Sequence, residues 1–225
     1  MNENISEDMG QNVSIKTMGK ISRKERRERL MQEMDLMMKK NSGITKASEL
    51  YTLGMDYRKI QSFVDAGYLK RVKNGYYSLC VEEPSEESVV AGLFPDGILT
   101  LESALFYYGY IKKKPLQWQI AVDKNTSKSR FKMDYPLVQP FYTEPEVLKM
   151  GVTEIPFAEG VMKIYNKERL LCDCMKFEEK LDHEIMKQAM IHYLADEEKN
   201  IGRLMEYAKI RKVARKVEDR IGVWL

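Results

Sequence analysis

The sequence predicts an α+β protein built from two domains, and three observations indicate this. Residues 42–78 read as two short helices followed by a hairpin. Residues 81–88 (VEEPSEES) are acidic and contain Pro84, which is typical of a domain boundary. Residues 89–225 mix short alternating stretches with longer helical ones. The chain has 225 residues, which is long for a single small helical module.

Residues 1–20 show no sustained period and are expected to form a flexible tail. From Ser22 onward, Leu30, Met34 and the pair Met37 and Met38 recur at helical spacing, so a first helix is predicted here. The front of this helix is strongly basic. Its cations could contact phosphates, or they could form an ordinary solvated turn: Arg23, Lys24, Arg26, Arg27 and Arg29.

Two short helices are predicted next, separated by a tight turn at Gly54. Thr45 is the expected N-cap of the first, because its hydroxyl can accept a bond from an unpaired backbone N–H. Asp56 is the expected N-cap of the second, whose apolar face contains Ile60, Phe63 and Val64. Gly67 is expected to end that helix.

A basic hairpin follows directly. Asn74 and Gly75 both tolerate positive φ, which predicts a type I′ turn, and Lys70, Arg71 and Lys73 lie on the incoming strand. Two helices joined by a turn and followed by such a hairpin form a winged helix-turn-helix DNA-binding domain, predicted over residues 21–80. In this module the second helix enters the major groove and the hairpin rests on the DNA backbone.

Helical geometry indicates which side chains would read bases. Since Ile60 and Phe63 face the core, Arg58 and Ser62 point outward, although an ordinary solvated helix face is the alternative. Arg and Gln are suited to pairing with guanine and adenine. The full predicted DNA-binding set is Thr45, Tyr57, Arg58, Lys59, Gln61, Ser62, Lys70, Arg71, Lys73 and Asn74.

The charge distribution agrees with this prediction. The net charge of +3 conceals an excess of +7 in residues 20–80, which hold fourteen Lys and Arg against seven Asp and Glu. Residues 81–225 carry a net charge of −2, from twenty-two basic and twenty-four acidic residues. Positive charge therefore gathers where the DNA-binding domain is predicted, as a phosphate-binding surface requires.

The second domain, residues 89–225 after a linker at 81–88, is expected to be a small mixed α/β sheet followed by three helices. Residues 116–123 alternate as a strand does, and Leu116 and Trp118 are on its apolar face. Asp173 is expected on a solvated helix face. A C-terminal basic stripe could contact nucleic acid or form a salt-bridged helix: Lys209, Arg211, Lys212, Arg215, Lys216 and Arg220.

Enzymatic motifs are absent from the sequence. It has no glycine-rich phosphate loop, no dinucleotide fingerprint and no paired-histidine zinc motif. Cys172 and Cys174 do not have zinc-ligand spacing, and His183 and His192 do not share a helical face. We therefore expect a non-enzymatic protein with no catalytic residues, metal or cofactor. Three cysteines and the lack of a long apolar run predict a cytoplasmic protein without a membrane partner.

Several segments together resemble the AbiEi-type antitoxins of bacterial abortive-infection systems. They are the winged-helix stretch GITKASEL…LG…YRKI…GYLKRVKNGYY, TLESALFYYGY at 100–110 and ERLLCD at 168–173. The resemblance spans roughly residues 30–220. The helix and hairpin pattern is shared with many regulators, whereas its combination with the two later segments is more specific.

This resemblance implies two roles. The first is repression of the protein's own operon, through binding of double-stranded DNA at inverted repeats in its promoter. The second is antitoxin activity of the C-terminal domain against a nucleotidyltransferase toxin, in a type IV system in which no stable complex between the two is required. Two alternatives stay open: a regulator whose second domain binds a ligand or partner, and an enzyme that modifies a toxin or nucleic acid.

Overall fold

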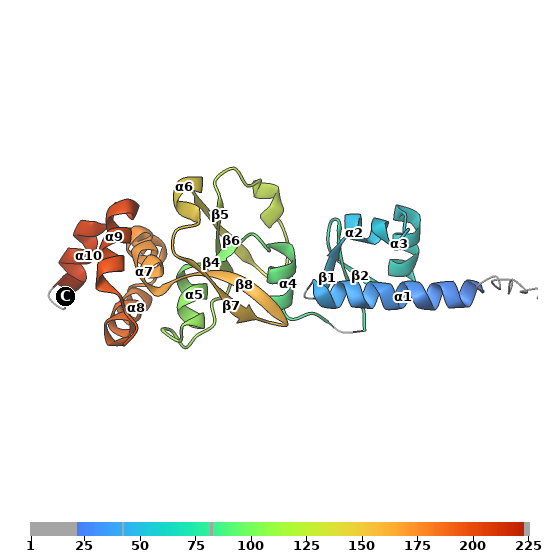
Figure 1. Ribbon diagram of the computed structural model, residues 1–225, viewed down its shortest axis with the longest axis horizontal. Helices are drawn as coiled ribbons and strands as arrows, with labels where there is room; N and C mark the ends of the chain where they lie inside the picture. Colours follow the sequence, from blue (N-terminus) through green and yellow to red (C-terminus); the bar gives the residue numbers. More distant parts are fainter. Residues whose placement is uncertain (1–21, 42, 82, 223–225) are drawn as a thin grey trace, which may run out of the picture.

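The protein is a mixed α+β structure with two sheets, seen here in a computed structural model that describes residues 22–41, 43–81 and 83–222. The described residues form an elongated molecule. An N-terminal unit lies at one end, a five-stranded sheet in the middle and helices α7–α10 at the other end (Figure 1). The predicted tail at residues 1–20 lies outside the described residues.

The N-terminal unit contains three helices and a three-stranded antiparallel sheet of order β1-β3-β2. Its elements are α1 (Arg23–Lys40), β1 (Ile44–Lys46), α2 (Ala47–Thr52), α3 (Tyr57–Asp65), β2 (Leu69–Lys73) and β3 (Tyr76–Leu79). The helices bury Leu30, Met34, Leu50, Ile60 and Phe63 in a common cluster against the sheet. Burial of these large apolar side chains is the main force that holds the unit together.

Local capping explains where the helices begin. The Ser22 hydroxyl accepts from the Glu25 N–H at 3.1 Å, and the Glu25 carboxylate accepts in return from the Ser22 N–H at 2.8 Å. Asp56 caps α3 by accepting from the Lys59 N–H at 2.7 Å, which confirms the predicted cap. Gly54 and Gly67 have positive φ, also as predicted.

Two local predictions are wrong. Thr45 is not an N-cap: it is buried in β1 and its hydroxyl donates to the Glu49 carboxylate at 2.6 Å, while Lys46 holds the N-cap position of α2. The hairpin turn is not type I′, because φ is positive at Gly75 (+79°) but not at Asn74. Next to this turn, the pairing of β2 with β3 is irregular, because its register shifts between Arg71 and Lys73.

The second unit is built on a mixed sheet of order β6-β5-β4-β8-β7. β4 pairs in parallel with β8 and β5 with β6, and the other two pairings are antiparallel. Its elements are α4 (Glu86–Leu93), β4 (Ile98–Leu99), α5 (Leu101–Tyr107), β5 (Trp118–Asp123), η1 (Lys128–Phe131), β6 (Val138–Thr143), α6 (Pro145–Leu148), β7 (Val152–Phe157), β8 (Gly160–Tyr165), α7 (Lys167–Lys176), η2 (Glu178–Lys180), α8 (His183–Ala195), α9 (Ile201–Arg211) and α10 (Ala214–Ile221).

Helix α7 connects the sheet to the terminal helices, because it packs on α5, α8 and α9. Four α-helices follow the sheet in the described part of the chain, where three were predicted. The extra break falls at Lys212, whose left-handed φ of +61° separates α9 from α10. Among the described residues, no helix combines the length and apolar character needed to cross a membrane.

The junction between the two units is tighter than predicted. Ser85 caps α4 by accepting from the Ser88 N–H at 3.1 Å, so the second half of the expected 81–88 linker belongs to a helix. Ile44 of β1 is buried in the core of the second unit, and Val72 and Tyr76 of the hairpin pack against that core. At α4, an added Cβ on Gly92 would lie 2.9 Å from the Ile44 Cβ, so the two units meet closely here.

Candidate nucleic-acid interface

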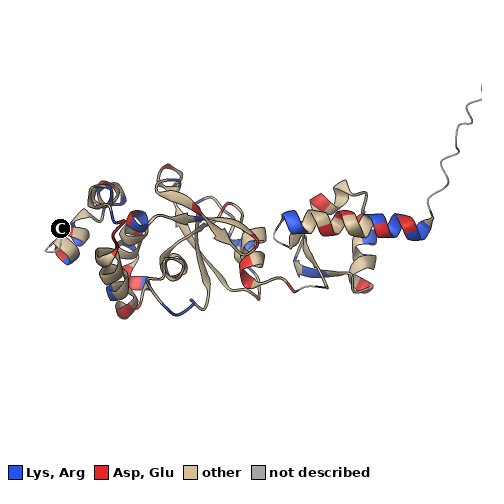
Figure 2. Cartoon of the chain, turned by 60° about the horizontal axis from the view of Figure 1, so that its bottom comes forward, with Lys and Arg blue, Asp and Glu red and all other residues tan. Residues whose placement is uncertain are grey.

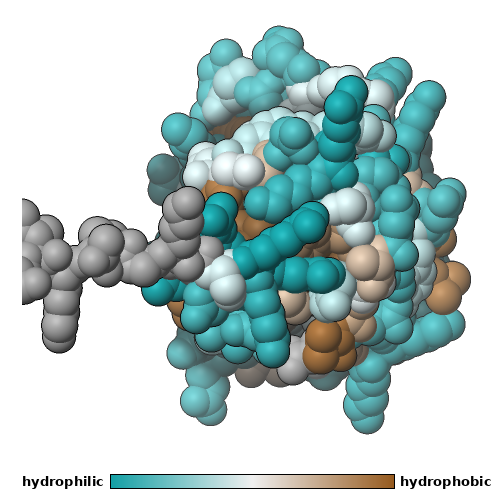
Figure 3. Space-filling view, turned by 90° about the vertical axis from the view of Figure 1, so that its right-hand side faces the viewer, coloured by the Kyte–Doolittle hydropathy of each residue, from teal (hydrophilic) through white to brown (hydrophobic). Residues whose placement is uncertain are grey.

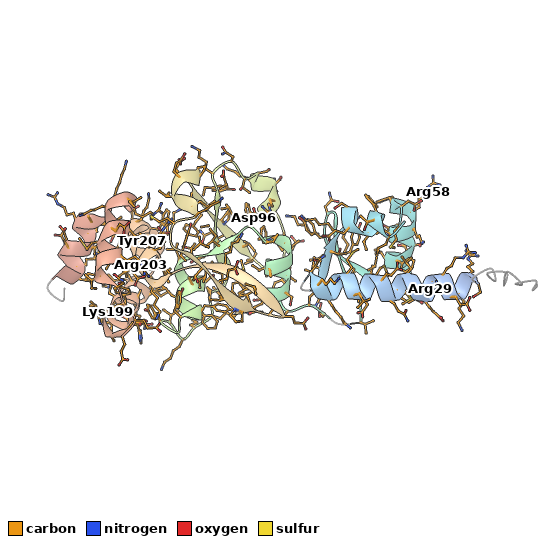
Figure 4. The ribbon with its side chains drawn as sticks, in the orientation of Figure 1. Arg29, Arg58, Asp96, Lys199, Arg203 and Tyr207 are labelled. Carbon is orange, nitrogen blue, oxygen red and sulfur yellow. The ribbon has the colours of Figure 1, made fainter. Side chains whose placement is uncertain are left out.

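Helix α3 presents a polar face at the outer end of the molecule. Tyr57, Arg58, Lys59 and Ser62 are exposed, while Ile60 on the opposite side is fully buried. Arg58 projects away from the body of the molecule (Figure 4). The cap at Asp56 and the buried apolar face together fix this orientation. The face can therefore offer an arginine and a lysine to a partner without rearrangement of the core.

Gln61 is less available than its neighbours. Its side chain is half-buried, and its amide donates to the Asp65 carboxylate at 2.8 Å along the same helix. The Ser62 hydroxyl likewise donates to the Lys59 carbonyl at 2.8 Å. An amide committed to an i,i+4 bond must give up that bond to read a base, so Arg58 and Lys59 are the better placed donors on α3.

The basic turn of α1 lies beside this face of α3. A groove of about 910 Å³ runs between the two helices. Its lining residues are Arg23, Lys24, Arg26, Arg27, Leu30, Lys59, Ser62 and Phe63. Arginines and lysines colour the outer end of α1 in Figure 2, and hydrophilic side chains cover much of this end of the molecule in Figure 3. The fold thus joins two basic segments that are about 35 residues apart in the sequence.

Arg27 is held in the groove by aromatic rings. Its guanidinium carbon lies 4.7 Å from the centroid of the Tyr68 ring and 5.7 Å from that of Phe63. Cation–π contacts of this kind leave the edge N–H groups of the guanidinium free to donate. Arg29, two residues further along α1, lies near the same end of the molecule (Figure 4).

Two cations of the hairpin, Lys70 and Arg71, are exposed and have different partners. Arg71 is exposed and donates to the Tyr77 hydroxyl at 3.3 Å, and Tyr77 and Tyr57 raise its pKa, so it lies near the start of α3. Lys70 is exposed and pairs with Glu83. Glu83 is itself largely exposed, so water screens this pair and a phosphate could displace it.

Lys73 and Thr45 do not fit their predicted roles. Lys73 is half-buried and its ammonium donates to the Arg130 carbonyl of the second unit, so it does not lie on an open phosphate-binding surface. Burial and the nearby charge of Arg130 lower the pKa of Lys73. Thr45, at 1% exposure, has no access to a DNA surface. Asn74 is exposed at the hairpin turn, as a DNA contact would need.

Substitution of Gly75 by valine is expected to deform the hairpin. Gly75 has a φ of +79°, and no atom lies within 4 Å of an added Cβ. The whole cost is therefore backbone strain, about 1–3 kcal/mol. We expect weaker DNA binding with the unfolding of the second unit unchanged, as measured by fluorescence anisotropy and circular dichroism. Unchanged DNA affinity would contradict a role for the hairpin.

Half of the C-terminal basic stripe is salt-bridged. Arg211 is buried and pairs with Asp173 at 2.7 Å. Lys216 and Arg220 both pair with Glu178 at 2.6 Å. These three cations are held by carboxylates of η2 and α7, which agrees with the salt-bridged alternative and leaves Lys209, Lys212 and Arg215 exposed.

The thiols and histidines of the second unit form no metal site among the described residues, where no group of three or more His, Cys, Asp and Glu side chains comes together. Burial raises the pKa of the Cys172 thiol to about 12, and it raises that of Cys174 as well. Thiols with such values are not nucleophiles at neutral pH. The His192 ring stacks on Tyr110 with a centroid distance of 5.9 Å.

Comparison with known proteins does not place the chain in a family. No protein-family model matches it, and no curated protein sequence matches it.

Proposed function

We propose that the protein is a winged-helix DNA-binding autorepressor and the antitoxin of a type IV system. The observation that carries the DNA-binding part is the exposed α3 face with the basic turn of α1 beside it. A helix that offers Arg58 and Lys59, flanked by further cations, has the chemistry for base pairing on the helix and phosphate contact around it. The antitoxin part rests on the resemblance of roughly residues 30–220 to the AbiEi-type family.

Replacing Arg58 with alanine is expected to weaken binding to the DNA upstream of the protein's own gene by about 1–3 kcal/mol and to relax sequence preference. Arg58 is exposed and forms no hydrogen bond or ion pair with the residues that the structure describes, so the weaker binding would come from a lost DNA contact and not from a less stable fold. Fluorescence anisotropy with the promoter fragment measures it. The matched control is Lys149→Ala, which removes an exposed cation from the second unit. Equal affinities for the Arg58 variant and the parent would refute the assignment.

The antitoxin role is tested in the full-length chain, since the hairpin packs on the second unit and fragments would expose that contact. Arg58→Ala, expressed from an independent promoter, should still relieve growth arrest by the neighbouring nucleotidyltransferase. If the variant lost both promoter binding and rescue, protection would act through DNA. In that case a direct role of the second unit against the toxin would be wrong.

A further inference from the structure

A cavity lies between the β2–β3 hairpin and residues 132–135 of the second unit. Its volume is about 760 Å³, and it is lined by Lys73 and Ser78 from the hairpin and by Lys132 from the second unit. Cavities of this size at the meeting of two structural units are typical places for small ligands. It is separate from the α1–α3 groove and shares no lining residue with it.

Three side chains at the cavity keep N–H or O–H groups that form no hydrogen bond with the described residues. The Ser78 hydroxyl is buried and bonds to no described residue. Among the residues that the structure describes, the Lys73 ammonium bonds only to the Arg130 carbonyl, which leaves two of its three hydrogens. Lys132 is exposed and forms no ion pair with any residue that the structure describes. A buried hydroxyl without a partner costs stability, and a ligand that accepts from it would remove that cost.

The carboxylates around the cavity are mostly neutralised. They are Glu83, Glu86 and Asp134. Glu83 pairs with Lys70, and Glu86 pairs with Lys114 at 2.8 Å and accepts from the Tyr135 hydroxyl. Arg71, also on the lining, is held by Tyr77. Because the Tyr77 hydroxyl carries no charge, the charges left unpaired are Arg71, Lys73 and Lys132 against Asp134, so the cavity favours an anion.

We propose that this cavity binds a small phosphate-bearing anion, with Lys73 and Lys132 facing its charge and Ser78 donating to one of its oxygens. Lys73 and Ser78 belong to the hairpin and Lys132 belongs to the second unit. The bound anion therefore links the hairpin to the second unit. This binding does not depend on the proposed DNA-binding function. Charge-assisted hydrogen bonds from two ammonium groups match the oxygens of a phosphate, and the cavity is large enough for a nucleotide.

Isothermal titration calorimetry of the full-length chain tests the proposal with two probes, pyrophosphate and adenosine diphosphate. The parent should bind one equivalent of pyrophosphate. Lys132→Ala and Ser78→Ala should each weaken that binding by about tenfold, the usual scale for one lost charged or buried hydrogen bond. The matched control is Lys128→Ala, which removes an exposed cation from the same loop outside the cavity and should leave the affinity unchanged.

Comparison of the two probes decides whether the cavity recognises a nucleotide or only its phosphate groups. Tighter binding of adenosine diphosphate would assign the cavity to a nucleotide, and equal binding would assign it to phosphate groups alone. The absence of heat with both probes at about 10 mM would overturn the proposal, because that affinity is too weak for a built site. Equal losses in the Lys128 and Lys132 variants would overturn it too, since diffuse surface charge would then explain the binding.

Discussion

Replacing Asp173 with asparagine is expected to destabilise the second unit by about 3–5 kcal/mol, the usual cost of removing one partner from a buried ion pair. The Asp173 carboxylate is 2% exposed and accepts from two buried arginines. The Arg169 Nε lies 3.2 Å from both of its oxygens, and the Arg211 Nε lies 2.7 Å from one. Asparagine has nearly the same shape, so the loss would come from the charge rather than from a cavity.

The rest of this network cannot compensate. Arg169 donates to the Val147 and Met150 carbonyls at 2.6 and 3.0 Å and stacks on the Tyr165 ring at 4.2 Å, but none of these partners carries a charge. Urea unfolding followed by circular dichroism measures the effect, with the exposed Glu179→Gln as the control. A loss below about 1 kcal/mol would mean that water or a neighbouring group solvates the two guanidinium groups.

Gly151→Ala is expected to destabilise the protein by about 2–5 kcal/mol, the sum of a left-handed backbone penalty and overpacking. Gly151 has a φ of +71°, and an added Cβ would lie 2.7 Å from the Arg169 Cβ and 3.0 Å from the Asn166 Oδ1. That Asn166 oxygen caps α7 by accepting from the Arg169 N–H at 3.0 Å. The methyl group would therefore disturb the start of α7 as well as the chain entering it.

Gly109 provides a matched control, because it has the same φ of +71° but nothing within 4 Å of an added Cβ. Gly109→Ala should cost only the backbone penalty, about 1–2 kcal/mol. The difference in the free energy of unfolding between the two variants isolates the steric part. Equal losses would show that the chain around Gly151 gives way at little cost.

Some features that depend on neighbours in the sequence could be predicted, although the Thr45 cap and the type I′ turn were predicted wrongly. Asp56 caps its helix as expected, because an N-cap bond involves only residues within one turn. The strand at 116–123 shows the limit of pattern reading. Leu116 is 87% exposed, and the strand begins at Trp118 with five consecutive buried residues, because β5 lies inside the sheet between β4 and β6.

Features that depend on distant residues could not be predicted. Asp173 is buried rather than solvated, because Arg211, thirty-eight positions away, neutralises it. Ile44 lies next to the N-terminal helices in sequence but packs in the second core. Likewise, the sequence indicated both α1 and α3 as basic, while only the fold places them along one groove. The sequence around a charged or apolar residue does not indicate which distant residue it contacts in the fold.

Because the molecule is elongated, the surfaces at its two ends are far enough apart to be covered independently. Helices α8 and α10 lie at the opposite end of the molecule from α1 and α3, with the five-stranded sheet between them (Figure 1). A macromolecule held on the terminal helices would not collide with a duplex lying against α3. If DNA binds at α3 as proposed, one copy of this chain has room for the duplex and for a second large partner on the terminal helices at the same time.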